Sequence, residues 1–270
     1  MLIDSHCHLD AGEFDADRAS VHARARAAGV MIQVLPAISL ANCATVAATC
    51  ARYPGCMPAW GMHPMYIATH RPQHLAGLRE WIERQRPVAL GEIGLDLFVP
   101  GLDPQQQTFY FVEQLKLACE FDLPVLLHCR RANDPVLKEL RRLGVKRGIA
   151  HAFSGSRQQA DAFIRQGFML GFGGAFTWSR ASRLRLLAQE LPLECMVLET
   201  DSPDIPPAWL GRDRNEPAEL AGICARLAEL RGISPAEVAA RTTANARALF
   251  GLTDDSSGTL PPPDDRWQGG

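Results

Sequence analysis

The chain has 270 residues, of which 47% are hydrophobic and 21% charged, and its formal net charge at pH 7 is -2. This is the composition of a globular protein with a substantial core, and it excludes a protein that binds nucleic acid through a global positive charge. No apolar run approaches the roughly 18 residues that a membrane-spanning helix needs. The chain starts without a signal-peptide pattern and its eight cysteines are scattered, so we expect a cytoplasmic protein without disulfides or membrane contact.

Short apolar segments alternate with longer amphipathic segments along the chain. Helices are expected where apolar residues recur at helical spacing, as Phe109, Val112 and Leu115 do within 104–121. The expected strands are 2–8, 30–35, 57–61, 88–92, 124–128, 147–151, 168–171 and 196–201. The expected helices are 14–28, 39–51, 72–85, 104–121, 134–143, 156–166, 181–190, 217–231 and 235–249.

This regular alternation predicts the α/β class and a single (β/α)8 TIM-type barrel. An open doubly wound sheet is the alternative, but the first strand is not followed by Gly-x-Gly-x-x-Gly and the chain has no P-loop. No linker divides the sequence. We therefore expect one domain over residues 1–252, followed by a flexible tail at 253–270 that is rich in Ser, Pro, Gly and Asp.

Histidines and carboxylates stand at or near the ends of five expected strands. They are His6, His8, Glu92, His128, His151 and Asp201. In a closed parallel barrel these ends converge on the rim where catalytic groups lie. Each residue alone has a structural explanation, such as a core hydrogen bond or a helix cap, but six buried polar groups together need partners. Nitrogen and oxygen donors without thiolate predict a divalent metal, Zn, Mn or Mg. Strand alternation is expected to turn Cys7 and Cys129 away.

Five more polar residues are candidates for supporting roles. Arg130, two residues after a candidate ligand and on its face, is expected to take a substrate phosphate. His63 is expected to hydrogen-bond the substrate or the leaving group, with a structural turn histidine as the alternative. Ser154 stands in a loop that offers backbone N–H groups to a phosphate. Asp4 and Glu199 share a strand face with the candidate ligands two residues after them and are expected to fix a ligand's orientation, with a simple loop or cap contact as the alternative for Asp4.

The motifs that contain these residues resemble one known family. They are Ile3-Asp-Ser-His-Cys-His8, Gly61-Met-His-Pro64, Gly91-Glu-Ile-Gly-Leu-Asp96, Pro124-Val-Leu-Leu-His-Cys-Arg130, His151-Ala-Phe-Ser-Gly155, Leu198-Glu-Thr-Asp-Ser-Pro203 and Arg214-Asn-Glu-Pro217. In this order, across about 250 residues, the sequence resembles the TatD-like metal-dependent hydrolases of the amidohydrolase superfamily, often described as deoxyribonucleases. The resemblance implies a (β/α)8 barrel.

The resemblance also implies a binuclear site for two divalent metal ions. The implied ligands are His6, His8 and Asp201 for one ion, His128 and His151 for the other, and Glu92 as the bridge. Two such ions activate a shared water and polarise the bond that is cut. Asp201 would orient or deprotonate that water as a general base.

The predicted function is hydrolysis of phosphodiester bonds in DNA, at an end or in single-stranded regions. The near-neutral charge argues against an enzyme that grips long duplex DNA, because such binding scales with the phosphates neutralised. A metal-dependent hydrolase of small phosphoesters, esters or amides is the alternative, because the same metal core would serve it. A non-enzymatic metal scaffold is less favoured, since these ligands converge on an open rim rather than on a closed tetrahedral site.

Overall fold

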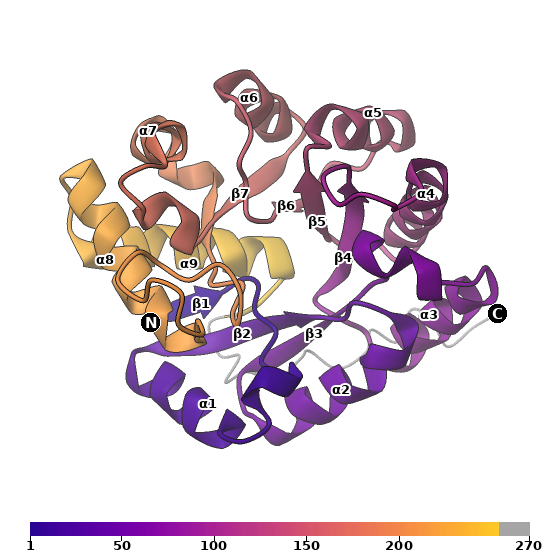
Figure 1. Ribbon diagram of the computed structural model, residues 1–270, viewed down its shortest axis with the longest axis horizontal. Coiled ribbons are helices and arrows are strands. Elements are labelled where there is room, and N and C mark those ends of the chain that lie inside the picture. Colours follow the sequence, from indigo (N-terminus) through magenta and orange to yellow (C-terminus); the bar gives the residue numbers. More distant parts are fainter. Residues whose placement is uncertain (254–270) are drawn as a thin grey trace.

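The computed structural model describes residues 1–253 and forms a barrel of parallel strands enclosed by helices (Figure 1). The strands follow one another around the sheet in chain order. They are β1 (Leu2–Asp4), β2 (Val30–Pro36), β3 (Cys56–Trp60), β4 (Ala89–Asp96), β5 (Val125–Arg130), β6 (Gly148–Ala150), β7 (Phe168–Phe172) and β8 (Met196–Leu198). The backbone N–H of Ser5 donates to the carbonyl of Leu198 at 3.0 Å, which joins the ends of β1 and β8. The predicted (β/α)8 TIM-type barrel is confirmed.

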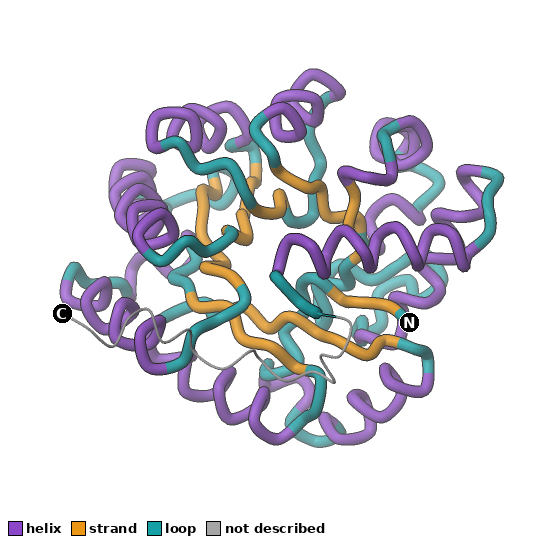
Figure 2. Tube along the Cα trace, turned by 180° about the vertical axis from the view of Figure 1, so that it is seen from behind, coloured by secondary structure: helices purple, strands orange, loops and turns teal. Residues whose placement is uncertain are grey.

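Helices connect the strands and cover the outside of the barrel, as the view from behind shows (Figure 2). The α-helices are α1 (Arg18–Ala27), α2 (Cys43–Arg52), α3 (Gln73–Arg84), α4 (Pro104–Glu120), α5 (Asn133–Leu143), α6 (Arg157–Arg165), α7 (Ser182–Glu190), α8 (Leu220–Arg231) and α9 (Pro235–Phe250). Local chemistry sets their ends. The carboxylate of Asp103 accepts from the first backbone N–H groups of α4, and α9 ends at Gly251, whose left-handed φ of 67° suits a residue without Cβ.

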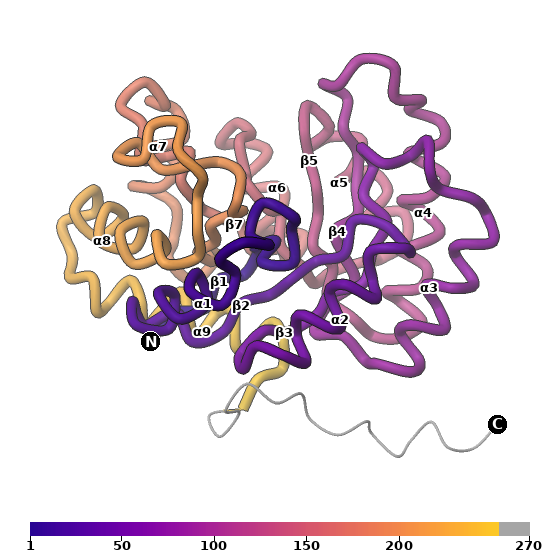
Figure 3. The backbone as a smooth tube through the Cα atoms, turned by 60° about the horizontal axis from the view of Figure 1, so that its bottom comes forward, coloured from indigo at the N-terminus to yellow at the C-terminus, as the bar shows by residue number. Residues whose placement is uncertain are grey.

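Helix α9 closes one end of the barrel. The apolar side chains inside the barrel, among them Ile3, Met57 and Val197, form one cluster with Leu249 and Phe250 of α9. Figure 3 shows α9 in yellow along the lower edge of the strands, near the N-terminus. The barrel is therefore sealed where its strands begin, and its accessible end is where they finish. Within the described residues, no helix is both long and apolar enough to span a bilayer.

The strand ends differ from the prediction at functionally important places. β1 stops at Asp4, because the Asp4 carboxylate takes the backbone N–H of His6 at 3.3 Å in place of a neighbouring strand. β8 likewise stops at Leu198, so Asp201 lies in the following loop. β4 continues past the predicted end to Asp96, which pairs with Arg130 of β5. The predicted tail, apart from its first residue, lies outside the described residues, and the domain boundary stays a prediction.

Candidate metal centre

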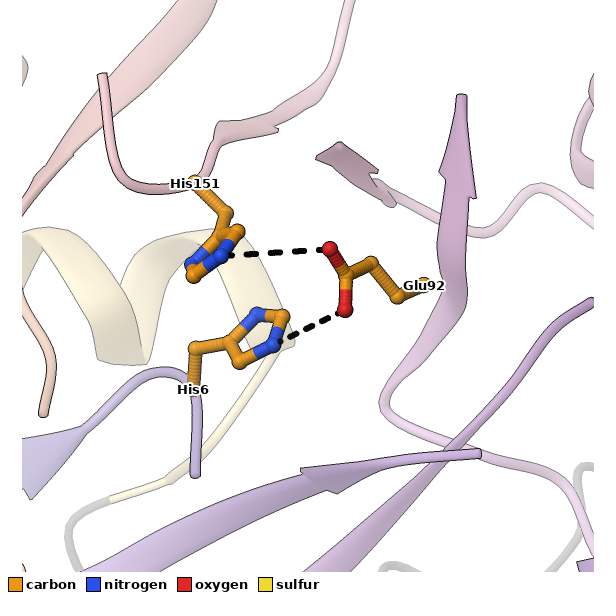
Figure 4. A group of neighbouring side chains, drawn as sticks. All are labelled: His6, Glu92 and His151. Carbon is orange, nitrogen blue, oxygen red and sulfur yellow. Dashed lines mark ion pairs between the residues drawn. The ribbon is translucent and has the colours of Figure 1, made fainter. Parts of the chain in front are cut away.

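The six predicted ligands meet at the open end of the barrel, and His63 joins them there. Figure 4 shows three of them, His6, Glu92 and His151, which come from different parts of the chain and point toward one another. The imidazole rings of His6 and His151 stack, with centroids 3.7 Å apart. Convergence of strand ends thus places these chain-distant side chains in one cluster, which we call the rim cluster.

One carboxylate oxygen of Glu92 faces the residues that follow β1. Glu92 Oε2 lies 3.2 Å from His6 Nε2 and 3.8 Å from His8 Nε2. Asp201 Oδ1 lies 3.6 Å from the same His6 nitrogen and 3.7 Å from that of His8. Four donor atoms therefore surround one small space.

The other carboxylate oxygen of Glu92 faces a second group of imidazoles. Glu92 Oε1 lies 2.9 Å from His128 Nδ1, 3.2 Å from His63 Nε2 and 3.8 Å from His151 Nε2. His63 Nε2 is itself 3.0 Å from His128 Nδ1. The carboxylate of Glu92 therefore stands between two sets of nitrogen donors, with one oxygen toward each.

These spacings fit divalent metal ions. Ligand atoms about 2.1 Å from a shared ion lie roughly 3.0–3.5 Å from one another, and most donor distances within the rim cluster are close to that range. Three groups of donors lie within 4.8 Å of one another: His6 with Glu92 and His151, His6 with His8 and Asp201, and His63 with Glu92 and His128. His63, predicted to contact substrate, therefore lies where it can also hold a metal.

Glycines allow Glu92 to reach this position. A Cβ at Gly91 would lie 2.6 Å from Leu126 Cβ on β5, and a Cβ at Gly61 would meet the backbone of Gly91. Both contacts are closer than packed atoms tolerate. The glycines of the motifs around residues 61 and 91 thus let neighbouring chain segments approach closely beside the bridging carboxylate.

Glu199 lies beside His151, where its carboxylate can orient the imidazole. Its Oε1 lies 3.1 Å from His151 Nδ1 and accepts the backbone N–H of Ala152 at 2.5 Å. A Cβ at Gly171 would collide with the Glu199 carboxylate, so glycine on β7 leaves the space that this carboxylate fills. Asp4 has a different position: its carboxylate contacts Thr200 and the backbone N–H of His6 rather than an imidazole.

Asp96 plays the equivalent part for His128, and sequence reasoning did not select it. Its Oδ2 lies 3.0 Å from His128 Nε2, and the residue is 1% exposed. The signal was present in the sequence, because residues 92, 94 and 96 share one face of a strand. It was missed because the strand was predicted to stop at Glu92.

Burial and opposite charges set the ionisation of the rim cluster. Burial alone would raise the pKa of Glu92, but the surrounding imidazoles outweigh it and hold this pKa well below its usual range. Burial lowers the pKa of His151, yet the carboxylates beside it, Glu199 first among them, raise it to about 10. Burial raises the pKa of Asp201 to about 6. The carboxylates of the rim cluster thus stabilise a positive charge among them, such as that of a protonated His151.

Several rim residues have backbone conformations that side chains disfavour. Asp201, Ala152 and Arg131 have φ values of 56°, 43° and 54°, in the left-handed region. Each stands directly after, or within three residues of, the end of a strand or a candidate ligand. Such strain gathers where surrounding structure holds side chains in functional positions.

A cavity of about 1020 Å³ opens above the rim cluster. The predicted substrate-binding residues His63, Arg130 and Ser154 all line it. Cys129 is also among the lining residues, but within the described residues its thiol belongs to none of the donor groups of the rim cluster. Burial raises the pKa of the Cys129 thiol.

Comparison with known proteins agrees with this geometry. A family model described as TatD related DNase matches residues 3–251. The chain belongs to this family. It is 41% identical over 256 residues to the uncharacterized metal-dependent hydrolase YjjV of Escherichia coli (strain K12), a match that covers 93% of this chain and 98% of the relative. The predicted resemblance to TatD-like metal-dependent hydrolases is confirmed, and the protein is an enzyme of that family.

A second relative and a solved structure extend the comparison. The 3'-5' ssDNA/RNA exonuclease TatD of Cronobacter sakazakii is 36% identical over 265 residues, which cover 92% of this chain and 97% of the relative. The crystal structure of the YjjV protein from Escherichia coli superposes with a TM-score of 0.90 at 39% identity, and covers 93% of this chain and 98% of that one. The relatives' metal dependence and the rim cluster together support use of divalent metal.

Proposed function

We propose that this TatD-family enzyme hydrolyses phosphodiester bonds in DNA, at single-stranded regions or ends, with two divalent metal ions in the rim cluster. The observation that carries the proposal is the position of Glu92. Its two oxygens face two separate sets of donors, at 3.2 Å to His6 on one side and 2.9 Å to His128 on the other. A bridging carboxylate with nitrogen ligands on both sides is suited to hold two ions close together.

In this proposal each ion has its own ligands. They are His6, His8 and Asp201 for one ion, His128 and His151 for the other, and Glu92 between them, with His63 beside the second ion. Imidazole suits Zn, while carboxylate suits Mg and Mn, so the mixed ligands here fit Zn, Mn or Mg, and the many imidazoles favour Zn. Glu199 and Asp96 contact the outer nitrogens of His151 and His128, and so fix the ring orientation of both.

The cations, when bound, supply charge neutralisation and polarise the phosphate of the substrate. Asp201 accepts the proton of the attacking water as the oxygen of that water bonds to phosphorus. The bond from phosphorus to the leaving deoxyribose oxygen then breaks, and that oxygen takes up a proton from water while Asp201 releases its own proton to water. Asp201 suits this role by position, because its carboxylate lies 3.6 Å from His6 Nε2 and borders the cavity that the substrate would enter.

Three observations support DNA as the substrate class. The rim cluster lies beneath a cavity of about 1020 Å³ that opens at the rim rather than inside a closed site. Arg130 stands at this opening with a half-exposed guanidinium, which suits a phosphate. Relatives named as 3'-5' ssDNA/RNA exonucleases share more than a third of the sequence, as the 36% identity to that of Cronobacter sakazakii shows.

The test is a cleavage assay with purified protein, labelled single-stranded and double-stranded DNA, and Mg²⁺, Mn²⁺ or Zn²⁺. A panel of small phosphoesters, carboxylic esters and amides runs beside it. Cleavage of single-stranded DNA that is lost in both Asp201→Asn and Glu92→Gln supports the proposal. Turnover of small substrates without DNA cleavage overturns it in favour of a small-molecule hydrolase, and metal binding without any turnover overturns the enzymatic role.

A further inference from the structure

Two arginine side chains lie over one exposed aromatic ring at the rim. Phe98 follows β4 and is 44% exposed. The guanidinium carbon of Arg130 lies 4.0 Å from the centre of its ring, and that of Arg131 lies 4.6 Å from it. Both distances fall within the range of cation–π attraction. The three side chains therefore form one unit, the Phe98 arginine pair, at the ends of β4 and β5.

The backbone beneath this unit is fixed to the rim cluster. Oδ1 of Asp96 accepts the N–H groups of Phe98 and Val99, both at 2.9 Å, while Oδ2 lies 3.0 Å from His128 Nε2. The N–H of Leu97 donates to the carbonyl of Arg130 at 2.9 Å. A single buried carboxylate thus holds a candidate metal ligand and the loop that carries the aromatic ring.

The position of Arg131 has a conformational cost. Its φ of 54° lies in the left-handed region, which a residue with a Cβ occupies only at a cost in free energy. Glycine would relieve this cost, but glycine has no guanidinium. Strained backbone that carries a charged side chain at a rim is typical of sites that bind a ligand.

The two guanidiniums have little negative charge to balance them. Among residues 1–253, their one ion-pair contact is between Arg130 Nη1 and Asp96 Oδ2, at 4.0 Å. The opposite side of the same cavity, formed by the loops after β1 and β8, carries the carboxylates Asp10, Glu13 and Asp204. A polyanion that reaches the rim cluster is therefore attracted on the β4–β5 side and repelled on the β1–β8 side.

We propose that the Phe98 arginine pair is a phosphate-binding subsite for the nucleic acid strand next to the bond that is cut. The strand leaves the cavity over the ends of β4 and β5, and the phosphate adjacent to the scissile one sits on Arg130 and Arg131. Phe98 holds both guanidiniums in place, which lowers the entropy cost of the contact. This inference rests on the proposed function, and it names a substrate feature that a small phosphodiester lacks.

The test compares two substrates in two rim variants. Arg131→Gln removes one charge, and Phe98→Leu keeps the apolar volume but removes the aromatic face. Arg52→Gln is the matched control, because Arg52 also lies over an aromatic ring, 5.7 Å from that of Tyr53, but at the opposite end of the barrel. Each protein is assayed on a short single-stranded oligonucleotide and on bis(4-nitrophenyl) phosphate, which has no adjacent phosphate.

We expect each rim variant to lose about tenfold more kcat/KM on the oligonucleotide than on the small diester, as is typical for loss of a charge-assisted contact. The control should show no such difference. Arg131→Gln should also flatten the dependence of oligonucleotide affinity on salt by about 0.7 in the log–log slope, the value for one phosphate contact on a single strand. Equal losses on both substrates, or an unchanged salt slope, would overturn the subsite.

Binding separates this inference from the proposed function. Fluorescence anisotropy with a labelled oligonucleotide and the Asp201→Asn protein reports affinity without cleavage, with and without Arg131→Gln. If the wild type cleaves no DNA but the oligonucleotide binds in an Arg131-dependent way, the subsite stands and the nuclease proposal fails. If the wild type cleaves DNA but Arg131→Gln leaves affinity unchanged, the nuclease proposal stands and the subsite is overturned. Absence of both binding and cleavage overturns both.

Discussion

The two ends of the barrel differ in the chemistry of their buried side chains, which are apolar at one end and polar or charged at the other. Where the strands begin, Leu249 and Phe250 of α9 pack onto apolar side chains inside the barrel. Where the strands finish, buried imidazoles and carboxylates crowd around Glu92, and residues such as Asp201 have left-handed backbone conformations. Apolar packing at the end covered by α9 stabilises the fold. Buried charges and left-handed backbone at the rim cluster lower the stability, but they position the groups that act on the substrate. Substitutions at the two ends should therefore change different observables.

Glu92→Gln should give the largest change at the open end. Loss of the bridging charge should lower the rate of DNA cleavage by about 10³-fold or more, since even a residue that only orients a metal ligand contributes about 10–100-fold. Cleavage rates at saturating Mn²⁺ measure the effect. Glu120→Gln, which alters an exposed ion pair with Arg79 on the outside of the barrel, should leave the rate unchanged. A similar loss in both variants would contradict a specific role for Glu92.

Phe250→Ala tests the sealed end. The side chain is 8% exposed and belongs to the cluster inside the barrel, so we expect the free energy of unfolding to fall by about 3–5 kcal/mol. Urea denaturation of the metal-free protein measures this change. Activity per folded molecule at low temperature should match the wild type. If the variant is less stable and its folded molecules are also less active than the wild type, the two ends of the barrel are coupled and the prediction is wrong.

Glu199→Gln should have an intermediate effect at the open end. The amide keeps the shape that Gly171 accommodates but removes the negative charge beside His151 Nδ1. Metal affinity or cleavage rate should fall by about 10–100-fold. Competition with a chromophoric chelator gives the affinity, and Glu190→Gln on the surface of α7 is the control. Unchanged affinity together with an unchanged rate would mean that Glu199 does not orient His151.

Asp4→Asn should have the smallest effect, and its sign depends on pH. Burial raises the pKa of Asp4 to about 8, so the folded protein holds this proton far more tightly than the unfolded chain does. The stability that Asp4 contributes is complete below the unfolded pKa of about 4 and falls as the pH rises toward 8. An amide removes this loss. Urea denaturation of metal-free protein at pH 5 and pH 9 measures the free energy of unfolding. The difference between the variant and the wild type should shift in favour of the variant at pH 9. Exposed Asp213→Asn should show no such trend.

Much of the fold and of the rim cluster was predictable because both follow from local pattern. Apolar runs separated by amphipathic segments predict a barrel, and a barrel brings strand ends together wherever they stand in the chain. For this reason His6, Glu92 and Asp201 could be grouped from sequence, although β1 and β8 proved to end before the first and the last of them. The grouping needed only the direction of each strand, not its length.

The rest depended on geometry that local pattern does not contain. Asp96 was missed because the end of β4 is set by its pairing with β5, as in the register of Asp96 with Arg130. The contact of Arg131 with Phe98 requires a left-handed backbone at a residue that is not glycine, which residue type argues against. Helix α9 was expected, but its place across the barrel is a tertiary packing choice.

The central claim is that Glu92 joins two metal-binding sites in one rim cluster. Titration of metal-free protein with Mn²⁺, followed by electron paramagnetic resonance, counts the ions and shows whether they are close enough to couple. We predict two coupled ions per wild-type chain, and loss of the coupling with at most one tightly bound ion in Glu92→Gln. A single ion in the wild type, or the same coupled pair in the variant, would contradict the account.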